Sequence, residues 1–376
     1  MNFNDDLKRT WAEIDLEAIK SNYRAIRKAI PAGCRFLGVL KADAYGHGAL
    51  KVAELLQSEG ADYFAVACID EAIALRDAGI TVPILILGHT PGEYTKALID
   101  YNLTQTVTCL SKAQEYSAKA AEAGRVLKVH IKVDTGMSRL GFLCDGEYFP
   151  EGVKNILSAC ALPGLDPEGI YTHFAMSDEP TAEGKAYTDK QLSLFKRMVG
   201  ALEENDLSFP IRHCANSGAV VDYPEACMDM VRPGLLLYGY GDAGNKLGLK
   251  PCMRLVTKIS TIKIYDPGVR VSYGGHYVTS RKTRVAVLGI GYADGLFRSL
   301  SNKCSFSICG KTAPQIGNIC MDMCMADITD IPEAAVDSEV EIFGTGNSIL
   351  MLSEAAGTIP YELLCSVSKR VPRVYK

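Results

Sequence analysis

The sequence predicts an α/β protein in which an N-terminal (β/α)8 barrel is followed by a mostly β C-terminal domain. Up to about residue 240, short apolar runs alternate with longer segments whose apolar residues recur at helical spacing. The chain contains eight such runs, the number of strands in a parallel barrel of about 250 residues. After about residue 245 the helical period disappears and only short strand-like runs continue. This change of rhythm predicts two domains of different class.

The eight predicted barrel strands share an apolar, β-rich composition. They are FLGVLK (36–41), YFAVAC (63–68), ILILG (84–88), TQTVT (104–108), LKVHIKV (127–133), GIYTHF (169–174), PIRHCAN (210–216) and MVRPGLLLYG (230–239). Between them lie helix candidates at 49–60, 70–79 and 111–124, and each of these ends in Gly, a common helix stop.

An open doubly wound sheet is the competing architecture, but no G-x-G-x-x-G follows the first predicted strand. The placement of the polar residues also favours a barrel, because active sites of barrel enzymes form where the strands end. Residues at or just past the ends of the apolar runs, or late within them, are Lys41, Asp134, Arg139, His173, Asn216 and Arg232.

In the C-terminal part, 254–265 and 269–279 flank the turn Asp266-Pro267-Gly268, a pattern that predicts a hairpin. Further short strands are expected at 283–292, 305–310 and 338–344. The polar, Gly-rich loop 240–250 separates the two rhythms. We therefore expect the barrel to span residues 11–242 and the β domain to span residues 243–376.

Composition excludes several function classes. The net charge is −4 without a cluster of Lys and Arg, so the chain has no electrostatic footprint for nucleic acid. No window approaches the ~18 consecutive apolar residues of a membrane helix, and the N-terminus lacks the apolar core of a secretory signal. The 13 cysteines lie among apolar neighbours, and the Cys320–Cys324 pair has no partners for a zinc site. We expect a cytoplasmic protein with reduced thiols and no metal.

Lys41 is the first candidate for chemistry. It follows an apolar run, where desolvation lowers a lysine pKa and prepares the amine for a Schiff base with an aldehyde. Position alone favours an ordinary solvated lysine at a strand end. The following residues Tyr45, Gly46, His47 and Gly48 change this balance, because they form a tight turn into a helix where amides and a phenol can meet an anion.

The segment VLKADAYGHG (39–48) closely resembles the pyridoxal-phosphate signature of alanine racemases. The resemblance runs over nearly the whole chain. It continues through HIKVDTGMSRLG (130–141), YTHFA (171–175), HCANSGA (213–219), DMVRPGLLLYG (229–239), VSYG (271–274), GYADG (291–295), GNICMDM (317–323) and YELLCSVSKRVPRVY (361–375). In that family an N-terminal barrel precedes a C-terminal β domain, and about the first ten residues, here 1–10, join the β domain.

The resemblance implies an enzyme that interconverts L-alanine and D-alanine through a pyridoxal 5′-phosphate aldimine. Lys41 would hold the cofactor and act as one base, and Tyr273, contributed by the other subunit of a homodimer, would act as the second. A phenol has a pKa near ~10 and needs nearby positive charge or hydrogen bonds to act at neutral pH. A buried hairpin tyrosine is the alternative reading of Tyr273. The family's biological role is to supply D-alanine for the bacterial cell wall.

The resemblance also assigns residues around the cofactor. Arg232 would donate to the pyridine nitrogen, and because arginine is effectively always protonated, it cannot supply a proton there. His173 and His213 would form a hydrogen-bond chain around it. Besides Lys41, the expected cofactor-binding residues are Tyr45, Arg139, His173, Asn216, Ser217, Arg232, Gly234 and Tyr361.

Substrate binding is assigned in the same way. Arg139 would reach the cofactor's phenolic oxygen and the substrate carboxylate, a task suited to its planar fork. The backbone amide of Met321 would complete carboxylate binding. Lys132 matches a lysine that is carbamylated in many members of the family, and Asp134 could serve as a neighbouring acceptor. Asp322 is interpreted as holding its loop in place.

Three alternatives remain at this stage. The same chemistry could act on serine or on a range of amino acids, although Tyr361, which narrows the pocket in the family, favours alanine. A fold-related decarboxylase shares the barrel and the lysine, but its essential cysteine motif is absent. A non-catalytic pyridoxal-phosphate carrier consists of a barrel alone, so the β domain argues against it.

Overall fold

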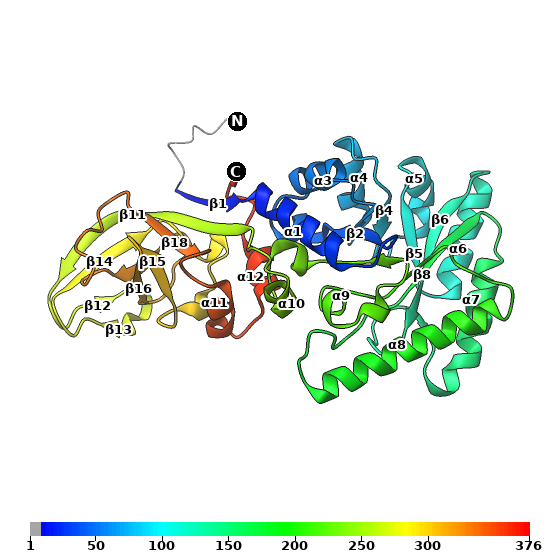
Figure 1. Ribbon diagram of the computed structural model, residues 1–376. Coiled ribbons are helices and arrows are strands. Elements are labelled where there is room, and N and C mark those ends of the chain that lie inside the picture. The colour runs from blue at the N-terminus through cyan, green and yellow to red at the C-terminus, as the bar shows by residue number, and fades with distance from the viewer. Residues whose placement is uncertain (1–8) are drawn as a thin grey trace. The chain divides into compact units, whose positions relative to one another are not determined.

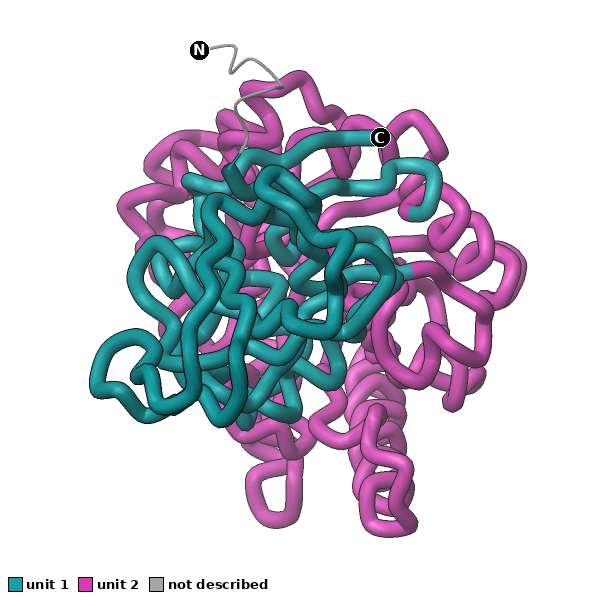
Figure 2. The backbone as a smooth tube through the Cα atoms, turned by 90° about the vertical axis from the view of Figure 1, so that its left-hand side faces the viewer, with its two compact units in different colours: residues 1–18, 45–48, 251–376 teal, residues 19–44, 49–250 magenta. Residues whose placement is uncertain are grey.

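The computed structural model describes residues 9–376, and backbone contacts divide the chain into two compact units (Figures 1 and 2). The barrel unit contains residues 19–44 and 49–250, and the C-terminal unit contains the described part of 1–18 together with 45–48 and 251–376. Most of the segment 1–10, expected to join the β domain, lies outside the described residues. The predicted boundaries at 11–242 and 243–376 stay a prediction.

Parallel strands form the centre of the barrel unit. They are β2 (Arg35–Val39), β3 (Tyr63–Val66), β4 (Ile84–Ile86), β5 (Thr104–Val107), β6 (Leu127–Asp134), β8 (Leu165–Tyr171), β9 (Ile211–His213) and β10 (Met230–Val231). Their order is β10-β2-β3-β4-β5-β6-β8-β9, with the short β7 (Phe142–Leu143) on β6. Strands β9 and β10 do not pair as a ladder, but two backbone hydrogen bonds connect their segments. The Asp229 N–H donates to the Arg212 carbonyl (3.1 Å), and the Arg232 N–H donates to the Ala215 carbonyl (2.9 Å). The predicted barrel is confirmed as a nearly closed ring.

Helices follow the strands around this ring (Figure 1). They are α1 (Leu16–Ala29), α3 (Ala49–Ser58), α4 (Ile69–Asp77), α5 (Thr95–Asp100), α6 (Leu110–Glu122), α7 (Phe149–Cys160), α8 (Ala182–Glu203), α9 (Ala219–Asp222) and α10 (Asp242–Lys246). Single 3-10 turns occur at Gly92–Tyr94, Gly146–Tyr148 and Pro224–Ala226. The predicted helices at 49–60, 70–79 and 111–124 correspond to α3, α4 and α6.

The last predicted strand, 230–239, is wrong in extent. Only Met230 and Val231 pair as a strand, and a 3-10 helix follows at Leu235–Tyr238. Pro233 has no N–H to continue a ladder, so the chain leaves the sheet there.

The C-terminal unit is built on a mostly antiparallel sheet. Its strands are β1 (Thr10–Ile14), β11 (Met253–Tyr265), β14 (Thr283–Leu288), β15 (Ser305–Ile308), β16 (Lys311–Ile316), β17 (Cys324–Asp327), β18 (Glu339–Phe343) and β19 (Arg373–Tyr375). The order is β14-β17-β16-β15-β18-β11-β1-β19, β14 also pairs with β11, and β1 and β19 pair in parallel. Helices α11 (Ile349–Ala356) and α12 (Pro360–Ser366) and 3-10 turns at Tyr292–Asp294 and Arg298–Leu300 complete the unit. The predicted β character of this part is confirmed.

The hairpin predicted around Asp266-Pro267-Gly268 is wrong. Strand β11 pairs with β14, with Tyr265 opposite Thr283, and not with 269–279. The intervening chain forms its own ribbon, β12 (Arg270–Val271) with β13 (Tyr277–Val278), around the 3-10 turn Tyr273–Gly275. Thr279 closes the base of this ribbon, because its carbonyl accepts from the Gly268 N–H and its hydroxyl accepts from the Val269 N–H.

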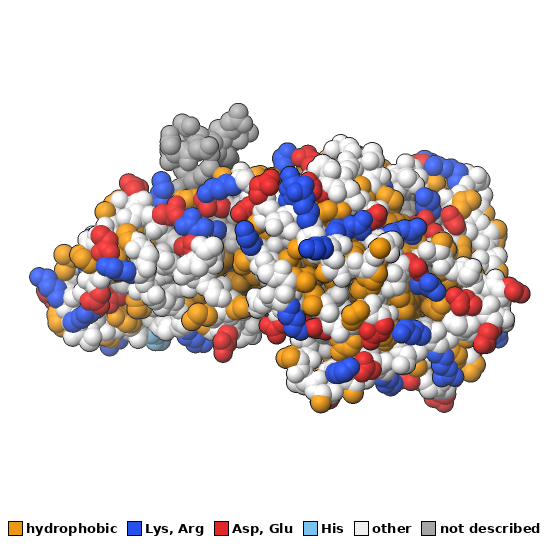
Figure 3. All heavy atoms as spheres, in the orientation of Figure 1, with side chains coloured by type: hydrophobic (Ala, Val, Ile, Leu, Met, Phe, Trp, Pro, Cys, Tyr) orange, Lys and Arg blue, Asp and Glu red, His pale blue; other side chains and the backbone are white. Residues whose placement is uncertain are grey.

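On the face drawn in Figure 3, acidic and basic side chains are intermixed. Within residues 9–376, no helix combines the length and the apolar character that a membrane crossing requires.

Candidate active site

Lys41 stands at the start of a left-handed turn. It follows β2 and opens α2 (Lys41–Tyr45), in which Ala42, Asp43, Ala44 and Tyr45 have φ between 53° and 54°. Non-glycine residues adopt this conformation at a cost of roughly 1–2 kcal/mol each, so neighbouring groups must hold the turn. The turn into a helix that the sequence indicates is therefore present in a more strained form.

Two carboxylates hold this turn. The Glu71 side chain on α4 accepts hydrogen bonds from the backbone N–H of Ala42 and of Ala67, both at 2.7 Å. Asp43 accepts from the N–H of Ala49 at 2.7 Å, at the first residue of α3. The backbone that carries Lys41 is thus fixed on both sides, although Glu71 gave no recognisable signal in the sequence.

Arg232 directly follows β10 in the barrel unit, and its side chain is only 4% exposed. Its Nη1 donates to His213 Nδ1 at 2.9 Å. Its Nη2 donates to the carbonyls of Thr172 (2.7 Å) and Cys214 (3.2 Å) and lies 3.3 Å from His173 Nδ1. The expected contacts of Arg232 with both histidines are present.

Both histidines beside Arg232 are neutral. Burial, followed by the positive charge of Arg232, holds the pKa of His173 and of His213 well below the ordinary histidine value. Since a guanidinium only donates hydrogen bonds, Nδ1 of His213 must be an unprotonated acceptor. Arg232 is therefore a fixed cation whose ring partners carry no charge.

Lys132 on β6 is a second buried cation, 4% exposed. Burial, with the charges of Arg139 and Arg232, lowers its pKa to about 7. Its Nζ lies 5.3 Å from the centre of the Tyr171 ring. A substantial fraction of this amine is unprotonated near neutral pH, which is the reactive form of a lysine.

Asp134 organises the loop that presents Arg139. One carboxylate oxygen accepts from the N–H groups of Gly136 (2.9 Å) and Ser138 (3.0 Å), and the other accepts from the N–H of Arg139 (3.1 Å). The Arg139 side chain is exposed. Asp134, expected as an acceptor, thus acts on the backbone and shapes the loop.

Three of the expected cofactor-binding residues, Asn216, Ser217 and Gly234, lie together after β9 and β10. The Ser217 hydroxyl oxygen accepts from the N–H of Gly234 (2.9 Å) and of Leu236 (3.3 Å). Asn216 accepts from the Ser177 hydroxyl (2.6 Å) and from the N–H of Ala219 (3.2 Å). Ser217 and Gly234 are therefore in direct contact, whereas Asn216 fixes the loop beside them.

The C-terminal unit, taken by itself, contains two further groups of predicted site residues. The first is a pair of aromatic rings, Tyr45 and Tyr361, with centres 5.9 Å apart. Burial, followed by the neighbouring Tyr361, raises the pKa of Tyr45 far above the usual tyrosine value. Tyr45 is therefore a neutral hydrogen-bond donor.

The second group contains Tyr273, whose side chain is 73% exposed. Ser272 adopts a φ of 67°, and the Asn318 amide donates to the Tyr273 carbonyl at 2.7 Å, so the backbone of this turn is held while the phenol stays exposed. A pocket of about 480 Å³ borders Tyr273, with Lys263 and Arg270 in its wall. Tyr273 is therefore not the buried hairpin tyrosine that the sequence left open as an alternative.

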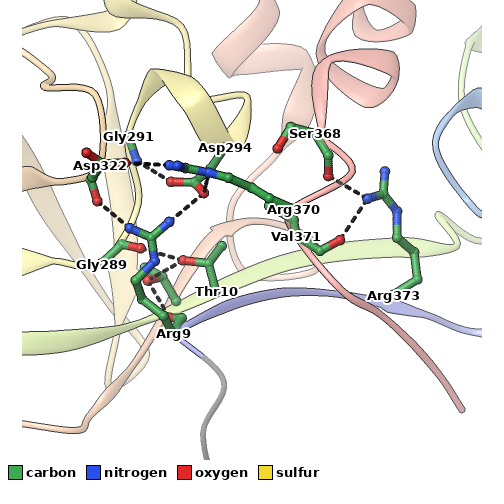
Figure 4. Close-up of polar contacts among 11 residues, drawn as sticks. Arg9, Thr10, Gly289, Gly291, Asp294, Asp322, Ser368, Arg370, Val371 and Arg373 are labelled. Atoms are coloured by element: carbon green, nitrogen blue, oxygen red, sulfur yellow. Dashed lines mark hydrogen bonds and ion pairs between the residues drawn. The ribbon is translucent and has the colours of Figure 1, made fainter. Parts of the chain in front are cut away.

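The loop that carries Met321 is anchored by a buried carboxylate (Figure 4). Asp294, 1% exposed, accepts from Arg9 Nη2 (2.6 Å), Arg370 Nε (2.7 Å) and the N–H of Gly291 (2.9 Å). Arg9 also donates to the Asp322 carbonyl (2.8 Å), and Arg370 to the Asp322 carboxylate (2.9 Å). Asp294 lies within the motif GYADG, yet its anchoring role could not be read from the sequence.

Within each unit, several of the predicted site residues contact one another. In the barrel unit Arg232 contacts His173 and His213, and Ser217 separately contacts Gly234. The C-terminal unit pairs Tyr45 with Tyr361 and places Tyr273 and Cys320, the residue before Met321, at one pocket.

Comparison with known proteins decides the family. A family model described as "Alanine racemase, N-terminal domain" matches residues 14–242, and one described as "Alanine racemase, C-terminal domain" matches residues 252–375. The chain belongs to the alanine racemase family. Membership in this family makes it an isomerase.

Individual relatives agree over the full length. The chain is 43% identical to an alanine racemase of Clostridium perfringens, covering 98% of this chain and 96% of that protein. Among solved structures, an alanine racemase of Clostridium difficile has a TM-score of 0.91 at 41% identity, covering 98% of this chain and 96% of that one. An alanine racemase of Bacillus anthracis with bound L-Ala-P has a TM-score of 0.90 at 32% identity, covering 100% and 96%.

Proposed function

We propose that this chain interconverts L-alanine and D-alanine with Lys41 and Tyr273 as its two bases and pyridoxal 5′-phosphate as cofactor. The observation that carries the proposal is Arg232, a buried guanidinium held at both terminal nitrogens by neutral partners. Family membership supports alanine as the substrate, as does the L-Ala-P named as bound to the Bacillus anthracis relative.

The residues present fit this cofactor. Lys41, Lys132, Arg139 and Arg232 all belong to the barrel unit, and their charges act together on His173. Such a cluster of cations suits a ligand that carries a phosphate, a phenolate and a substrate carboxylate. Ser217 accepts two hydrogen bonds through its oxygen, so its O–H proton is available to donate to an anion.

The holding residues follow from this fit. Lys41 would bind the aldehyde carbon and Arg232 the pyridine nitrogen. The phosphate and the ring would be met by Tyr45, His173, Asn216, Ser217, Gly234 and Tyr361. Arg139 would meet the phenolic oxygen.

Bound pyridoxal phosphate withdraws electrons from the α-carbon and makes its hydrogen acidic. Inversion then needs one group that removes the proton from one face and a second that returns a proton to the other. We assign these tasks to Lys41 Nζ and Tyr273 Oη. The exposure of the Tyr273 side chain supports this role, because a phenol that acts on a substrate bound to the other subunit must be accessible at the surface of its own chain.

Arg232 limits the reaction to racemisation. It would donate a hydrogen bond to the ring nitrogen of the cofactor but would give up no proton, since arginine stays protonated in proteins. A less electron-poor ring favours return of the proton to the α-carbon over side reactions such as transamination. The neutral state of His173 and His213 supports this role, because neither ring has a surplus proton to pass on.

The substrate carboxylate would be bound by Arg139 and by the backbone amide of Met321. Among the described residues, no hydrogen bond engages this amide, while the Met321 carbonyl accepts from Ala293 at 3.0 Å. A carbamate on Lys132 would supply the anion that holds Arg139. The low pKa of Lys132 supports this modification, because carbon dioxide reacts with the unprotonated amine.

We further propose a homodimer with shared sites, in which Tyr273 and Met321 come from the partner. An exposed phenol beside a pocket on the C-terminal unit supports this arrangement. In a cell the product would be D-alanine for the cell wall.

Exchange of the α-hydrogen with solvent deuterium tests the two bases. Because L- and D-alanine are equally stable, loss of either base slows racemisation equally in both directions. Exchange without inversion distinguishes the bases, since each serves one face. We expect Tyr273→Phe to retain exchange of one enantiomer only, while racemisation falls by at least ~100-fold.

The result is read by mass spectrometry of each recovered enantiomer. Exchange of both enantiomers at the rate of the unmodified enzyme would remove Tyr273 as a base. Tyr292→Phe, an exposed tyrosine of the same unit, controls for loss of a phenol.

A further inference from the structure

Arg232 is a buried cation without a carboxylate beside it. In residues 9–376 no acidic side chain forms an ion pair with this guanidinium; its acceptors are two carbonyls and two neutral imidazoles. A buried charge is costly unless an opposite charge or strong hydrogen bonds compensate it. The contacts of His213 lead to a candidate compensating group.

A row of buried side chains runs from Arg232 through the inside of the barrel unit. His213 Nε2 lies 2.9 Å from His130 Nδ1, and His130 Nε2 lies 3.6 Å from Glu168 Oε1. Both imidazoles are completely buried. Glu168 also accepts hydrogen bonds from the hydroxyls of Tyr63 and Thr104.

The backbone opposite His130 makes room for this row. Gly169 pairs with His130 in the register of β8 and β6. A Cβ at residue 169 would lie 2.6–2.7 Å from three atoms of the His130 ring, a distance that real Cβ contacts do not reach. The position next to Glu168 therefore excludes every residue larger than glycine while the ring stays in place.

The two ends of the row fix every proton within it. Arg232 can only donate, so His213 Nδ1 accepts and its proton resides on Nε2. That proton is donated to His130 Nδ1, so the proton of His130 resides on Nε2 and points to Glu168. A carboxylate can only accept, and the arrangement is therefore consistent from end to end.

Glu168 is ionised at the end of the row. Burial raises its pKa, but the nearby His130 ring and the hydrogen bonds from Tyr63 and Thr104 outweigh that effect and bring the pKa to about 2. The pKa of His130 is lowered, first by burial and further by Arg232, while Glu168 opposes the shift. The row thus joins one cation to one anion through two neutral rings.

We propose that Glu168 is the remote counter-charge of Arg232, and that it fixes both His130 and His213 as Nε2–H tautomers so that His213 remains an acceptor for the guanidinium. Glu168 is a positioning residue that acts through the two rings. The effect of Glu168 on cofactor binding rests on the proposed function of Arg232. The predicted tautomers of His130 and His213 do not depend on that function. Reversal of the row would place a proton between Arg232 and His213, where both groups would then be donors.

The tautomers are measured on cofactor-free protein labelled with 15N-histidine. Long-range 1H–15N correlation separates Nδ1–H, Nε2–H and doubly protonated rings, and the chain has only six histidines to assign. We expect neutral Nε2–H rings for His130 and His213 at pH 7. A Nδ1–H tautomer or an imidazolium at His213 at that pH would overturn the proposal, and this result needs no variant.

Substitutions then test the carboxylate. Glu168→Gln keeps the shape but replaces an obligate acceptor by an amide that can also donate. We expect His213 to exchange between two tautomers and the Kd for pyridoxal phosphate to rise about tenfold, the scale of a hydrogen bond to a charged group. Two controls are matched: Asp166→Asn, exposed on the same strand, and Tyr63→Phe, which removes one hydrogen bond to Glu168 but keeps its charge.

The outcomes separate the two claims. Both controls should keep the tautomers and the Kd of the unmodified protein. If Glu168→Gln does the same, Arg232 alone orders the row and the proposal fails. If the tautomers change while the Kd does not, Glu168 holds the row as proposed, and the assigned contact of Arg232 with the cofactor is the claim that fails.

Discussion

At the scale of single residues, positive charge dominates the site of the barrel unit. The pKa of Lys132 reflects this excess of positive charge, because burial and the charges of Arg139 and Arg232 lower it to about 7. The carboxylate of Asp134 is engaged with three backbone N–H groups, so it offers Lys132 only partial compensation. An anionic ligand, or a carbamate on Lys132, would relieve this excess of charge.

The first prediction concerns this lysine in cofactor-free protein without carbon dioxide. Unfolded Lys132 binds its proton up to a pH near 10.5, whereas folded Lys132 loses it near 7. Between these values the unfolded state binds more protons, so the free energy of unfolding should rise with pH, by at most about 1.4 kcal/mol per pH unit. Below pH 7 this contribution no longer changes.

Denaturant unfolding at pH 6 to 9 measures this effect. Lys132→Met should remove the extra slope between pH 7 and 9. Added bicarbonate should stabilise the unmodified protein and leave Lys132→Met unchanged. Parallel stability curves for the two proteins would show that Lys132 carries no such shift.

The sequence identified many of these residues but not their supporting contacts. Arg232, His173 and His213 lie at or just after the ends of strands, and the apolar pattern of the sequence predicts where those strands end. Glu168 follows Pro167 in a strand that is only partly apolar, and its partners Tyr63, Thr104 and His130 come from three other strands. Such a set is visible only once the strand register is known, and the same is true of Asp294 with Arg9 and Arg370.

At the scale of elements, the left-handed turn after β2 is the strained segment of the site. Ala42 lies in it with a φ of 53° and an exposed side chain, so its Cβ costs conformational energy without any packing gain. Hydrogen bonds to Glu71 and Asp43 hold the turn in place. Strain concentrated beside the proposed cofactor lysine, Lys41, is consistent with a functional constraint on that backbone.

A second prediction follows from this strain. Ala42→Gly should raise the free energy of unfolding by up to about 1 kcal/mol, because glycine adopts positive φ without steric cost and only part of the gain is lost to the unfolded chain. The matched control is Ala74→Gly at an exposed position of the right-handed helix α4, which should lower stability by about 1 kcal/mol. Chemical denaturation compares both; equal destabilisation by the two variants would contradict the strained turn.

Elements also mark where the sequence patterns failed. The turn Asp266-Pro267-Gly268 is present in sequence, but the chain after it pairs with itself, and β14 takes the place beside β11. Local turn residues specify a change of direction, whereas the choice of strand partner depends on long-range packing. For the same reason the pattern could not reveal that β1 pairs with β11 and β19.

At the scale of the whole molecule, the change from helical to strand period was enough to predict two folds in one chain. The prediction succeeds because a parallel barrel repeats a single unit eight times and each repeat carries its own apolar signature. The predicted active site divides along the same line: Lys41, Arg139 and Arg232 belong to the barrel unit, and Tyr273 and Met321 to the C-terminal unit. The proposed homodimer unites these two halves across subunits.

Mixing two inactive variants tests this central claim most directly. Lys41→Ala and Tyr273→Phe each inactivate every site of their own dimer. After unfolding, mixing and refolding, half of the dimers carry one chain of each kind, and each of these has one intact site, composed of Lys41 from one chain and Tyr273 from the other. Alanine racemisation should therefore return to about a quarter of the unmodified activity. No recovery, with mixed dimers verified by mass spectrometry, would contradict a site shared between subunits.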